Sequence, residues 1–248
     1  MSALFEVKNL TKHFGGLTAV DHVNFAVKEG EIMGLIGPNG SGKTTIFNLI
    51  NSYFPVSDGT ISFQGQDITN FSTNRIAKVG IGRTFQVVKP LKRLTVEDNV
   101  MAGAFANESS FAGARQVATD VLKFCHLDGD SQILAGSLPI GGRKRLEIAK
   151  ALATRPKLLL LDETAAGLNP TEVIEAIDIM KKIRDDLGIT IIIVEHNMKV
   201  IMTISDRIHA IAHGATISTG TPEVVAKDPA VIEAYLGTDY SIGDDKNA

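Results

Sequence analysis

The stretch GLIGPNGSGKTT, Gly34–Thr45, decides the fold class of this 248-residue chain. It carries the spacing G-x-x-x-x-G-K-[ST] between Gly37 and Thr44, after a predicted strand over Glu31–Ile36 and before a predicted helix starting near Lys43. Glycines let the backbone wrap round a phosphate, and inward N–H groups with the positive helix end attract it. A chance match in a chain of this length is on the order of one in a hundred. The stretch therefore predicts a phosphate-binding loop.

The side chains of this loop have separate predicted roles. Lys43 is expected to reach the β- and γ-phosphates as a catalytic group, and Thr44 to ligate Mg²⁺. The residues predicted to hold the nucleotide here are Gly37, Pro38, Asn39, Gly40, Ser41, Gly42, Lys43, Thr44 and Thr45.

Length and composition limit what can surround the loop. A chain of 248 residues fits one large α/β domain, or a core domain with a smaller inserted lobe. Its net charge of −3 argues against a general nucleic-acid binder, so no nucleic-acid partner is expected. Two short basic groups are interpreted as solvated faces or subunit contacts: Lys89, Lys92 and Arg93, and Arg143, Lys144 and Arg145.

Three features predict a cytoplasmic location. The N-terminus MSALFEVKNL lacks the pattern of a secretory signal. Cys125 is the single cysteine, which excludes an internal disulfide and suits a reducing compartment. The longest apolar runs, such as Leu158–Leu161 and Ile191–Val194, are far below the ~20 residues needed to cross a bilayer. Any membrane role is therefore expected to depend on a partner.

Strands and helices are predicted to alternate along much of the chain. Short apolar runs at Leu4–Leu10, Ala19–Val27 and Glu31–Gly37 predict strands separated by Gly-containing turns. A further strand pair is expected at Thr60–Gln64 and Gly82–Thr84. This alternation indicates βαβ units and a parallel sheet.

The middle of the chain changes character. Thr95 with Asp98 resembles a capping box, and the Ala-rich sequence that follows, as far as Ile133, predicts a helical lobe inserted into the α/β core. The lobe is expected to close at the Leu138–Lys150 element, a short Gly-containing turn that runs into a basic, amphipathic helix.

Another strand and helix follow the lobe. The apolar run Lys157–Leu161 predicts a strand buried on both faces. Asn169 and Pro170 predict the N-cap and first turn of a helix over Thr171–Leu187, which Gly188 ends.

Polar side chains end two predicted buried strands. LLLLDE ends with Asp162 and Glu163, and IIIVEH ends with His196. Ligands of open parallel sheets sit at the carboxyl ends of the strands, so these groups should lie beside the phosphate loop. Asp162 suits Mg²⁺ and Glu163 suits the orientation or deprotonation of an attacking water, with His196 as a second catalytic group.

His209 and His213 have the spacing H-x-x-x-H, which could suggest a metal site. No cysteine or third ligand lies near them in the sequence. We therefore interpret both histidines as residues of a strand face.

Six motifs in order resemble the nucleotide-binding subunits of ABC transporters over about Leu4 to Gly237. GPNGSGKTT is similar to the Walker A loop, LLLLDE to the Walker B strand, VEHNM to the switch-histidine loop and AAGLNP to the D-loop. RTFQ places the family's glutamine at Gln86, which the resemblance implies contacts nucleotide and metal. Phe14 in KHFGG falls where the family stacks an aromatic ring on adenine, although a Phe near a strand end is as often core packing.

The stretch LPIGGRKRLEIAKAL, Leu138–Leu152, stands where the family has its signature, usually L-S-G-G-Q. The residues that replace signature residues are Pro139, Ile140 and Gly142, and Gly141 is the matched one. The resemblance implies that Gly141 and Gly142 contact nucleotide. Thr164 is a further departure, where proline commonly follows the Walker B glutamate. L-P-x-G, TVEDNV and the ending PAVIEAYLG are similar to the branched-chain amino-acid importer branch.

The resemblance implies an α/β P-loop NTPase (RecA-like) with a mixed sheet core, an N-terminal antiparallel β portion and an inserted α-helical subdomain. The nucleotide-binding domain is expected over residues 1–237, with the subdomain at approximately 90–153 and a disordered polar tail at 238–248. ATP and Mg²⁺ are the implied ligands.

The implied function is that of an ATP-hydrolysing subunit of an importer. Two copies or two homologues would clamp two ATP molecules head to tail, each site pairing the Walker loops of one subunit with Gly141 of the other. Permease subunits would hold the dimer at the inner face of the cell membrane, and a periplasmic or extracellular solute-binding protein would act indirectly. Branched-chain or other hydrophobic amino acids are the expected cargo, with urea, short amides or aromatic acids as alternatives.

Two other classes fit less well. A soluble ABC protein acting on DNA or ribosomes would show a long coiled-coil insertion or two nucleotide domains. A small P-loop kinase or GTPase would explain Lys43 and Thr44, but not Gln86, Gly141 and His196 together.

Overall fold

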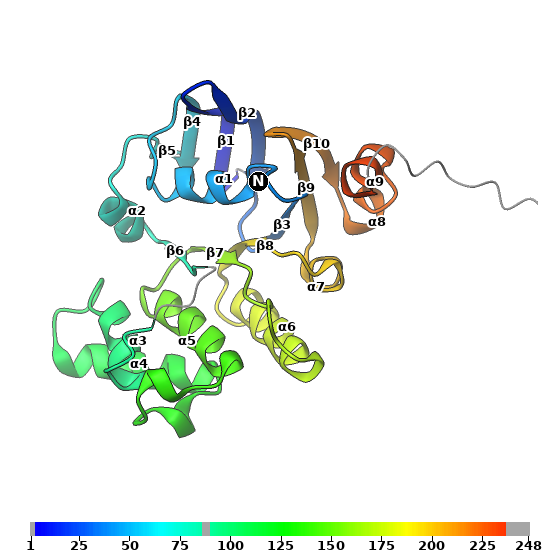
Figure 1. Cartoon of the computed structure of the whole chain (residues 1–248). Helices are drawn as coiled ribbons and strands as arrows, with labels where there is room; N and C mark the ends of the chain where they lie inside the picture. Colours follow the sequence, from blue (N-terminus) through cyan, green and yellow to red (C-terminus); the bar gives the residue numbers. More distant parts are fainter. Residues whose placement is uncertain (1–2, 86–89, 237–248) are drawn as a thin grey trace, which may run out of the picture.

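Two β-sheets organise the part of the chain that the computed structural model describes, residues 3–85 and 90–236 (Figure 1). The smaller sheet is antiparallel, in the order β2-β1-β4-β5. Its strands are β1 (Phe5–Phe14), β2 (Leu17–Val27), β4 (Asp58–Phe63) and β5 (Gln66–Asp67). This is the predicted N-terminal antiparallel portion.

The larger sheet has the order β10-β9-β3-β8-β7-β6. Its strands are β3 (Ile32–Ile36), β6 (Ile81–Arg83), β7 (Leu158–Asp162), β8 (Thr190–Val194), β9 (Arg207–Ala212) and β10 (Ala215–Gly220). Neighbours from β9 to β6 run parallel and β10 pairs antiparallel with β9, so the prediction of a mixed sheet is confirmed.

One predicted strand pair is wrong. Both strands exist, but β4 pairs with β1 in the antiparallel sheet, whereas β6 pairs with β7 in the mixed sheet. Two short apolar runs show that strands form, but the choice of partner is made by tertiary contacts far away in the sequence.

Nine α-helices lie within the described residues, and three of them form a lobe beside the mixed sheet (Figure 1). The lobe contains α3 (Val96–Ala104), α4 (Phe111–Phe124) and α5 (Ile140–Ala153), with short 3-10 turns at Asp128–Asp130 and Ala135–Ser137. The remaining helices are α1 (Lys43–Ile50), α2 (Thr73–Val79), α6 (Pro170–Asp185), α7 (Met198–Ile204), α8 (Pro222–Val225) and α9 (Pro229–Leu236).

The helix starts predicted at Thr95 and at Asn169 are confirmed, and the second of them forms the full reciprocal capping box. The Thr95 side chain accepts a hydrogen bond from the Asp98 backbone N–H at 3.0 Å and caps α3. Asn169 and Glu172 form a reciprocal capping box at α6, with Pro170 in the first turn. Such caps satisfy backbone N–H groups that have no partner inside the helix.

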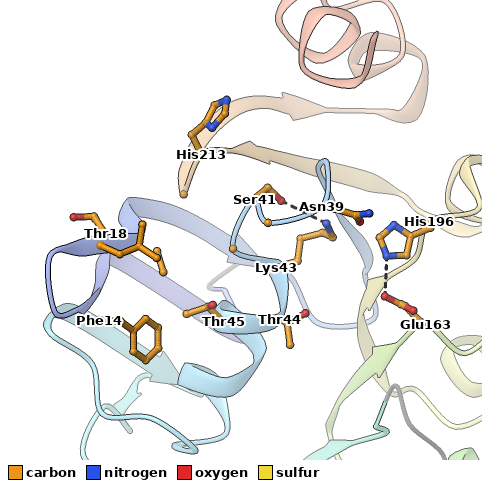
Figure 2. Close-up of a pocket in the computed structure, with 15 residues that line it drawn as sticks. Phe14, Thr18, Asn39, Ser41, Lys43, Thr44, Thr45, Glu163, His196 and His213 are labelled. Atoms are coloured by element: carbon orange, nitrogen blue, oxygen red, sulfur yellow. Dashed lines mark hydrogen bonds and ion pairs between the residues drawn. The ribbon is translucent and has the colours of Figure 1, made fainter. Parts of the chain in front are cut away.

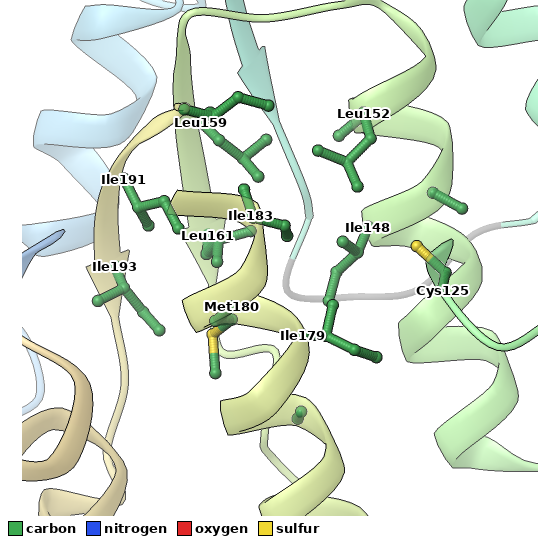
Figure 3. Close-up of a cluster of buried hydrophobic side chains, with 14 of the residues drawn as sticks. Cys125, Ile148, Leu152, Leu159, Leu161, Ile179, Met180, Ile183, Ile191 and Ile193 are labelled. Carbon is green, nitrogen blue, oxygen red and sulfur yellow. The ribbon is translucent and has the colours of Figure 1, made fainter. Parts of the chain in front are cut away.

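The mixed sheet separates two hydrophobic clusters because alternate residues of a strand point to opposite faces. Leu158, Leu160 and Ile192 face α1 and the antiparallel sheet. Leu159, Leu161 and Ile191 belong to the opposite cluster, where Figure 3 shows them near side chains of α5 and α6. The sheet is therefore covered on both faces, which leaves its strand ends as the place for a site.

Cys125 lies fully buried in that second cluster, where burial raises the pKa of its thiol to about 12. No helix in residues 3–85 and 90–236 is both long and apolar enough to cross a membrane.

Candidate nucleotide site

A cavity of about 800 Å³ opens where β3 ends and α1 begins. Its lining brings together residues that the sequence predicts as separate motifs: Phe14, Asn39, Gly40, Ser41, Gly42, Lys43, Thr44, Thr45, Glu163 and His196. Figure 2 shows the Lys43 side chain between the ring of Phe14 and the Glu163–His196 pair. The cavity therefore has an aromatic end and an acid–base end.

The loop glycines are required by close backbone approaches. Gly42 has a φ of 109°, and a Cβ there would lie 2.7 Å from the Ala19 carbonyl oxygen. A Cβ at Gly37 would meet the backbone oxygen of Ile211 and lie 2.5 Å from the Ser41 hydroxyl oxygen. Only glycine fits these two places, because a side chain at either would collide with the atoms around it.

Lys43 is buried and held by the loop itself. Its Nζ donates to the carbonyl oxygens of Gly37 at 2.7 Å and Pro38 at 2.9 Å, and lies 3.4 Å from Ser41 Oγ. Burial lowers the pKa of Lys43, while the negative charges of Glu163 and Asp162 act in the opposite direction. Neither Gly37 nor Pro38 lines the cavity. Both instead hold the Lys43 amino group through their backbone carbonyl oxygens.

Glu163 and His196 form a pair across two neighbouring strand ends. His196 Nε2 lies 2.7 Å from Glu163 Oε1, with the histidine side chain 48% and the glutamate side chain 13% exposed (Figure 2). Glu163 has a φ of 50°, and its N–H donates to the Val194 carbonyl oxygen at 2.9 Å. This left-handed backbone, unusual for a non-glycine residue, occurs at a residue predicted to be catalytic.

Asp162 is buried one residue before this pair and bound to Arg83. Arg83 Nη2 donates to Asp162 Oδ2 at 3.0 Å, while Nη1 donates to Asn48 Oδ1 at 2.8 Å. Burial raises the pKa of Asp162 despite the neighbouring guanidinium. The other oxygen, Oδ1, is buried without a hydrogen-bond partner among the described residues. A buried carboxylate oxygen whose lone pairs accept no hydrogen bond is suited to bind a hard cation or one of its water ligands.

Phe14 stands at the far end of the cavity from Glu163. The ring is 41% exposed, packs edge-on to Phe54 with centroids 5.2 Å apart, and has Lys12 Nζ 5.0 Å from its centroid. Phe14 is one of the residues that line the cavity, and an aromatic ring there suits contact with a planar base.

The two histidines of H-x-x-x-H have different places. His209 lies fully buried on β9, where its ring nitrogens bond to the hydroxyls of Thr219 at 2.8 Å and Thr216 at 3.1 Å. Burial lowers its pKa to about 4, in agreement with a strand-face residue. His213 lies in the turn after β9 and lines the cavity, so its assignment to a strand face is wrong.

The signature residues Gly141 and Gly142 are not among the residues that line the cavity. They are buried in the first turn of α5, and a Cβ at Gly141 would meet the Glu172 carboxylate of α6. Pro139 and Ile140 before them are exposed. The chain therefore keeps this helix start away from its own phosphate loop.

Lys144, one helical turn further along α5, points inward. It is buried, and its Nζ donates to the Glu163 carbonyl oxygen at 2.6 Å. The interpretation of Lys144 as part of a solvated basic face is therefore wrong. Burial lowers its pKa, an effect that Glu195 opposes most strongly.

The buried carboxylate of Glu195 completes this network. Glu195 Oε1 accepts from the Ala165 N–H at 2.6 Å and lies 3.4 Å from the Thr164 hydroxyl. Thr164, a departure from the family pattern, thus contributes a polar contact that proline could not make. Arg83, Lys144 and Glu195 were missed from sequence, although Glu195 could have been suspected as a charge inside a buried strand end.

Gln86 and Lys89 lie outside the described residues, and so do the last residues of the chain from 237 to 248. The predictions for Gln86 and for the polar tail at 238–248 therefore stay predictions.

The phosphate loop after the parallel strand β3, the acid at the end of β7 in the same sheet and the Glu163–His196 pair define a P-loop nucleoside triphosphatase. Sequence comparison narrows this class. Residues 20–166 match the family described as ABC transporter, and residues 215–241 match the family described as branched-chain amino acid ATP-binding cassette transporter.

Relatives agree over nearly the whole chain. The high-affinity branched-chain amino acid transport ATP-binding proteins BraF of Pseudomonas aeruginosa and LivG of Escherichia coli are each 39% identical, over 94% of this chain and 98% of their own. The crystal structure of an ATP-binding cassette of an ABC transporter in its ADP conformation has a TM-score of 0.87 at 31% identity, covering 96% of this chain and 100% of its own.

This chain belongs to the ABC transporter family, as an ATP-binding subunit. The predicted fold class, the ATPase activity and the resemblance to the branched-chain amino-acid transporter type are confirmed.

Proposed function

We propose that this chain energises the uptake of branched-chain or other hydrophobic amino acids, hydrolysing ATP as it dimerises against membrane subunits. The match of residues 215–241 to the branched-chain amino acid family supports the cargo. The observation that carries the chemistry is the Glu163–His196 pair, 2.7 Å apart at the edge of the phosphate-loop cavity. We further propose that residues 1–237 act as one nucleotide-binding domain, with residues 90–153 as its helical subdomain.

The chain's own groups divide the work on ATP. Phe14 stacks on the adenine, the loop from Gly37 to Thr45 surrounds the phosphates, and Lys43 moves from its carbonyl partners to the β- and γ-oxygens. Glu163 accepts a proton from the attacking water, and His196 holds the carboxylate and the γ-phosphate in place. The positive φ of Glu163 aims the carboxylate at the cavity.

Thr44 and Asp162 would hold Mg²⁺, with Gln86 as a third polar group implied by the family. The buried, unpartnered Oδ1 of Asp162 fits this role. The ion, when bound, neutralises the charge that develops on the transferred phosphoryl group.

A second nucleotide-binding subunit, identical or homologous, would complete each site. The start of α5 supports this proposal, because Gly141 lies outside the chain's own cavity while Pro139 and Ile140 are exposed beside it. Gly141 and Gly142 would then offer backbone N–H groups to the γ-phosphate held by the partner.

Permease subunits would anchor the dimer at the cytoplasmic face of the cell membrane, and a solute-binding protein outside would deliver cargo. Gln86 with Lys89, Lys92 and Arg93 would transmit closure to the permease. Charge reversal at Lys92 and Arg93 should then lower the permease-stimulated ATPase and leave basal hydrolysis nearly intact. Equal loss of both activities would contradict the coupling role.

The cargo is tested by reconstitution. The chain, its neighbouring permease subunits and their solute-binding protein should show ATPase stimulation by leucine, isoleucine or valine in proteoliposomes. Stimulation by urea, short amides or aromatic acids instead would favour a related importer. If the chain did not follow the membrane fraction in cells that contain its permease, a soluble ABC ATPase would be the better assignment.

A further inference from the structure

The C-terminal helix α9 reaches the beginning of the phosphate loop. The backbone N–H of Gly37 donates to the hydroxyl oxygen of Tyr235 at 2.8 Å, a contact between residues 198 positions apart. Figure 1 places α9 beside α8, at the β10 edge of the mixed sheet. The loop that holds phosphate is therefore fastened from outside as well as by its own residues.

The contact satisfies a buried donor. Gly37 is buried at the end of β3, where an N–H without a partner would be costly. The Tyr235 side chain is partly buried, with 41% of the residue exposed; this burial raises the pKa of its hydroxyl, while the bond from Gly37 acts in the opposite direction. The tyrosine is therefore protonated at neutral pH and accepts the bond as a neutral group.

Hydrogen bonds to Asp228 hold the start of α9 in place within the described chain. Asp228 accepts from the Ala230 N–H at 2.9 Å through its side chain, and from Val231 and Ile232 at 3.0 Å through its carbonyl oxygen. Val231 is buried in the same hydrophobic cluster as α6 and α7. Because the start of α9 is held in place, the position of the Tyr235 hydroxyl relative to Gly37 is also restrained.

Gly37 links Tyr235 to Lys43. Its N–H bonds to the tyrosine, and its carbonyl oxygen accepts the Lys43 Nζ at 2.7 Å. The space around its Cα is closed by the Ile211 backbone oxygen and the Ser41 side chain, which restricts any swing of this residue. A hydrogen bond to the Gly37 N–H therefore also restrains the position of the Gly37 carbonyl oxygen.

We propose that Tyr235 is a positioning residue of the ATP site, which fixes Gly37 and thereby the loop arrangement in which Lys43 and the loop N–H groups meet the phosphates. This inference rests on the proposed ATP site. Without the hydroxyl, the loop would have to be ordered when nucleotide binds, and the affinity for phosphates would fall.

The test is Tyr235→Phe, which removes the hydroxyl and keeps the ring. The control is Tyr53→Phe, which removes the same atom from a tyrosine that is 67% exposed. Equilibrium binding should show ATP and ADP held about 2- to 10-fold more weakly by Tyr235→Phe than by the native chain. Tyr53→Phe should bind both as the native chain does.

Adenosine separates positioning from loose packing, because it has no phosphate to meet the loop. Its affinity for Tyr235→Phe, measured as a competitor of a fluorescent nucleotide, should be unchanged. Native ATP affinity in Tyr235→Phe, or equal weakening of adenosine and ATP, would overturn the inference. A native chain that failed to bind ATP would overturn the proposed site itself, and this inference with it.

Discussion

Two glycine-containing turns in this chain open helices, and their geometries differ. The turn before α1 closes on its own lysine and lines a cavity of about 800 Å³. The first turn of α5 lines no part of that cavity, and a Cβ at either of its glycines would meet the chain's own Glu172 or Leu138. In the proposed function, the first turn binds nucleotide within one chain, and the second acts on the nucleotide that a partner subunit holds.

The difference lies in what glycine does at each place. Gly42 takes a positive φ that forms the loop, whereas Gly141 and Gly142 are helical residues that allow close packing. Within the described chain, no side chain caps the N-terminus of α5, so its first N–H groups are available to an external acceptor. Glycines at the start of a helix therefore do not by themselves make an anion-binding site within one chain. The conformation of the loop before the helix determines whether such a site forms.

The largest expected effect comes from a variant that separates ATP binding from ATP hydrolysis at the phosphate-loop cavity. Glu163→Gln keeps the size of the side chain and a partner for His196, but an amide cannot accept a proton from water. Turnover should fall about 10²- to 10⁴-fold, with ATP affinity retained and an ATP-dependent dimer trapped. Steady-state hydrolysis and size-exclusion chromatography measure the two effects. Hydrolysis at a near-native rate would remove Glu163 as the base.

The next effect tests the start of α5. Ile140→Asp, in the Glu163→Gln background, places a carboxylate at an exposed position that should face the partner's γ-phosphate. ATP-induced dimerisation should weaken at least about 10-fold, because like charges in contact cost several kcal/mol. ATP binding by the monomer should be unchanged.

Ile140→Asp is a sharper variant than Gly141→Asp, whose carboxylate would also meet Glu172 of the same chain. Pro139→Ser is the matched control: it adds a donor at the helix start and should dimerise normally. If Ile140→Asp dimerised with ATP as its parent does, the α5 start would not face a phosphate.

Sequence reasoning succeeded where the structure depends on neighbours in the chain. The phosphate loop, the Thr95 cap and the Asn169 capping box each form over a few residues. Strand-end residues such as Glu163 and His196 also met as expected, because parallel strands bring their carboxyl ends to one edge of the sheet.

Contacts between distant segments could not be predicted. Arg83 reaches Asp162, and Tyr235 reaches Gly37, over sequence separations of 79 and 198 residues with no local pattern to announce them. Lys144 was misread for a different reason: adjacent residues of a helix point in different directions, so a run of three basic residues does not make one solvated face. Its burial follows from the position of β7 under α5.

A smaller effect tests the contact between the start of α5 and the end of β7. Lys144→Met removes the donor to the Glu163 carbonyl oxygen and leaves the buried Glu195 carboxylate without a nearby cation. The free energy of unfolding should fall by about 1–3 kcal/mol in chemical denaturation, with a reduced rate of hydrolysis. Lys123→Met, at an exposed position on α4, is the control and should change neither quantity. Native stability and rate in Lys144→Met would show that α5 and the β7 end are independent.

The smallest effect concerns the aromatic end of the cavity, where the proposed contact is between the Phe14 ring and the base. Phe14→Ala should weaken ATP binding about 2- to 10-fold, because an aromatic contact contributes roughly 0.5–1.5 kcal/mol. The rate at saturating ATP should stay native, since Lys43, Glu163 and His196 are untouched. Phe14→Trp should restore affinity by keeping a ring against the base. Because Phe14 also packs on Phe54, ring loss could act through the fold; thermal unfolding of the nucleotide-free variant measures that part. If Phe14→Ala bound ATP like the native chain, the ring would be core packing, and the phosphate loop would carry the recognition of nucleotide without it.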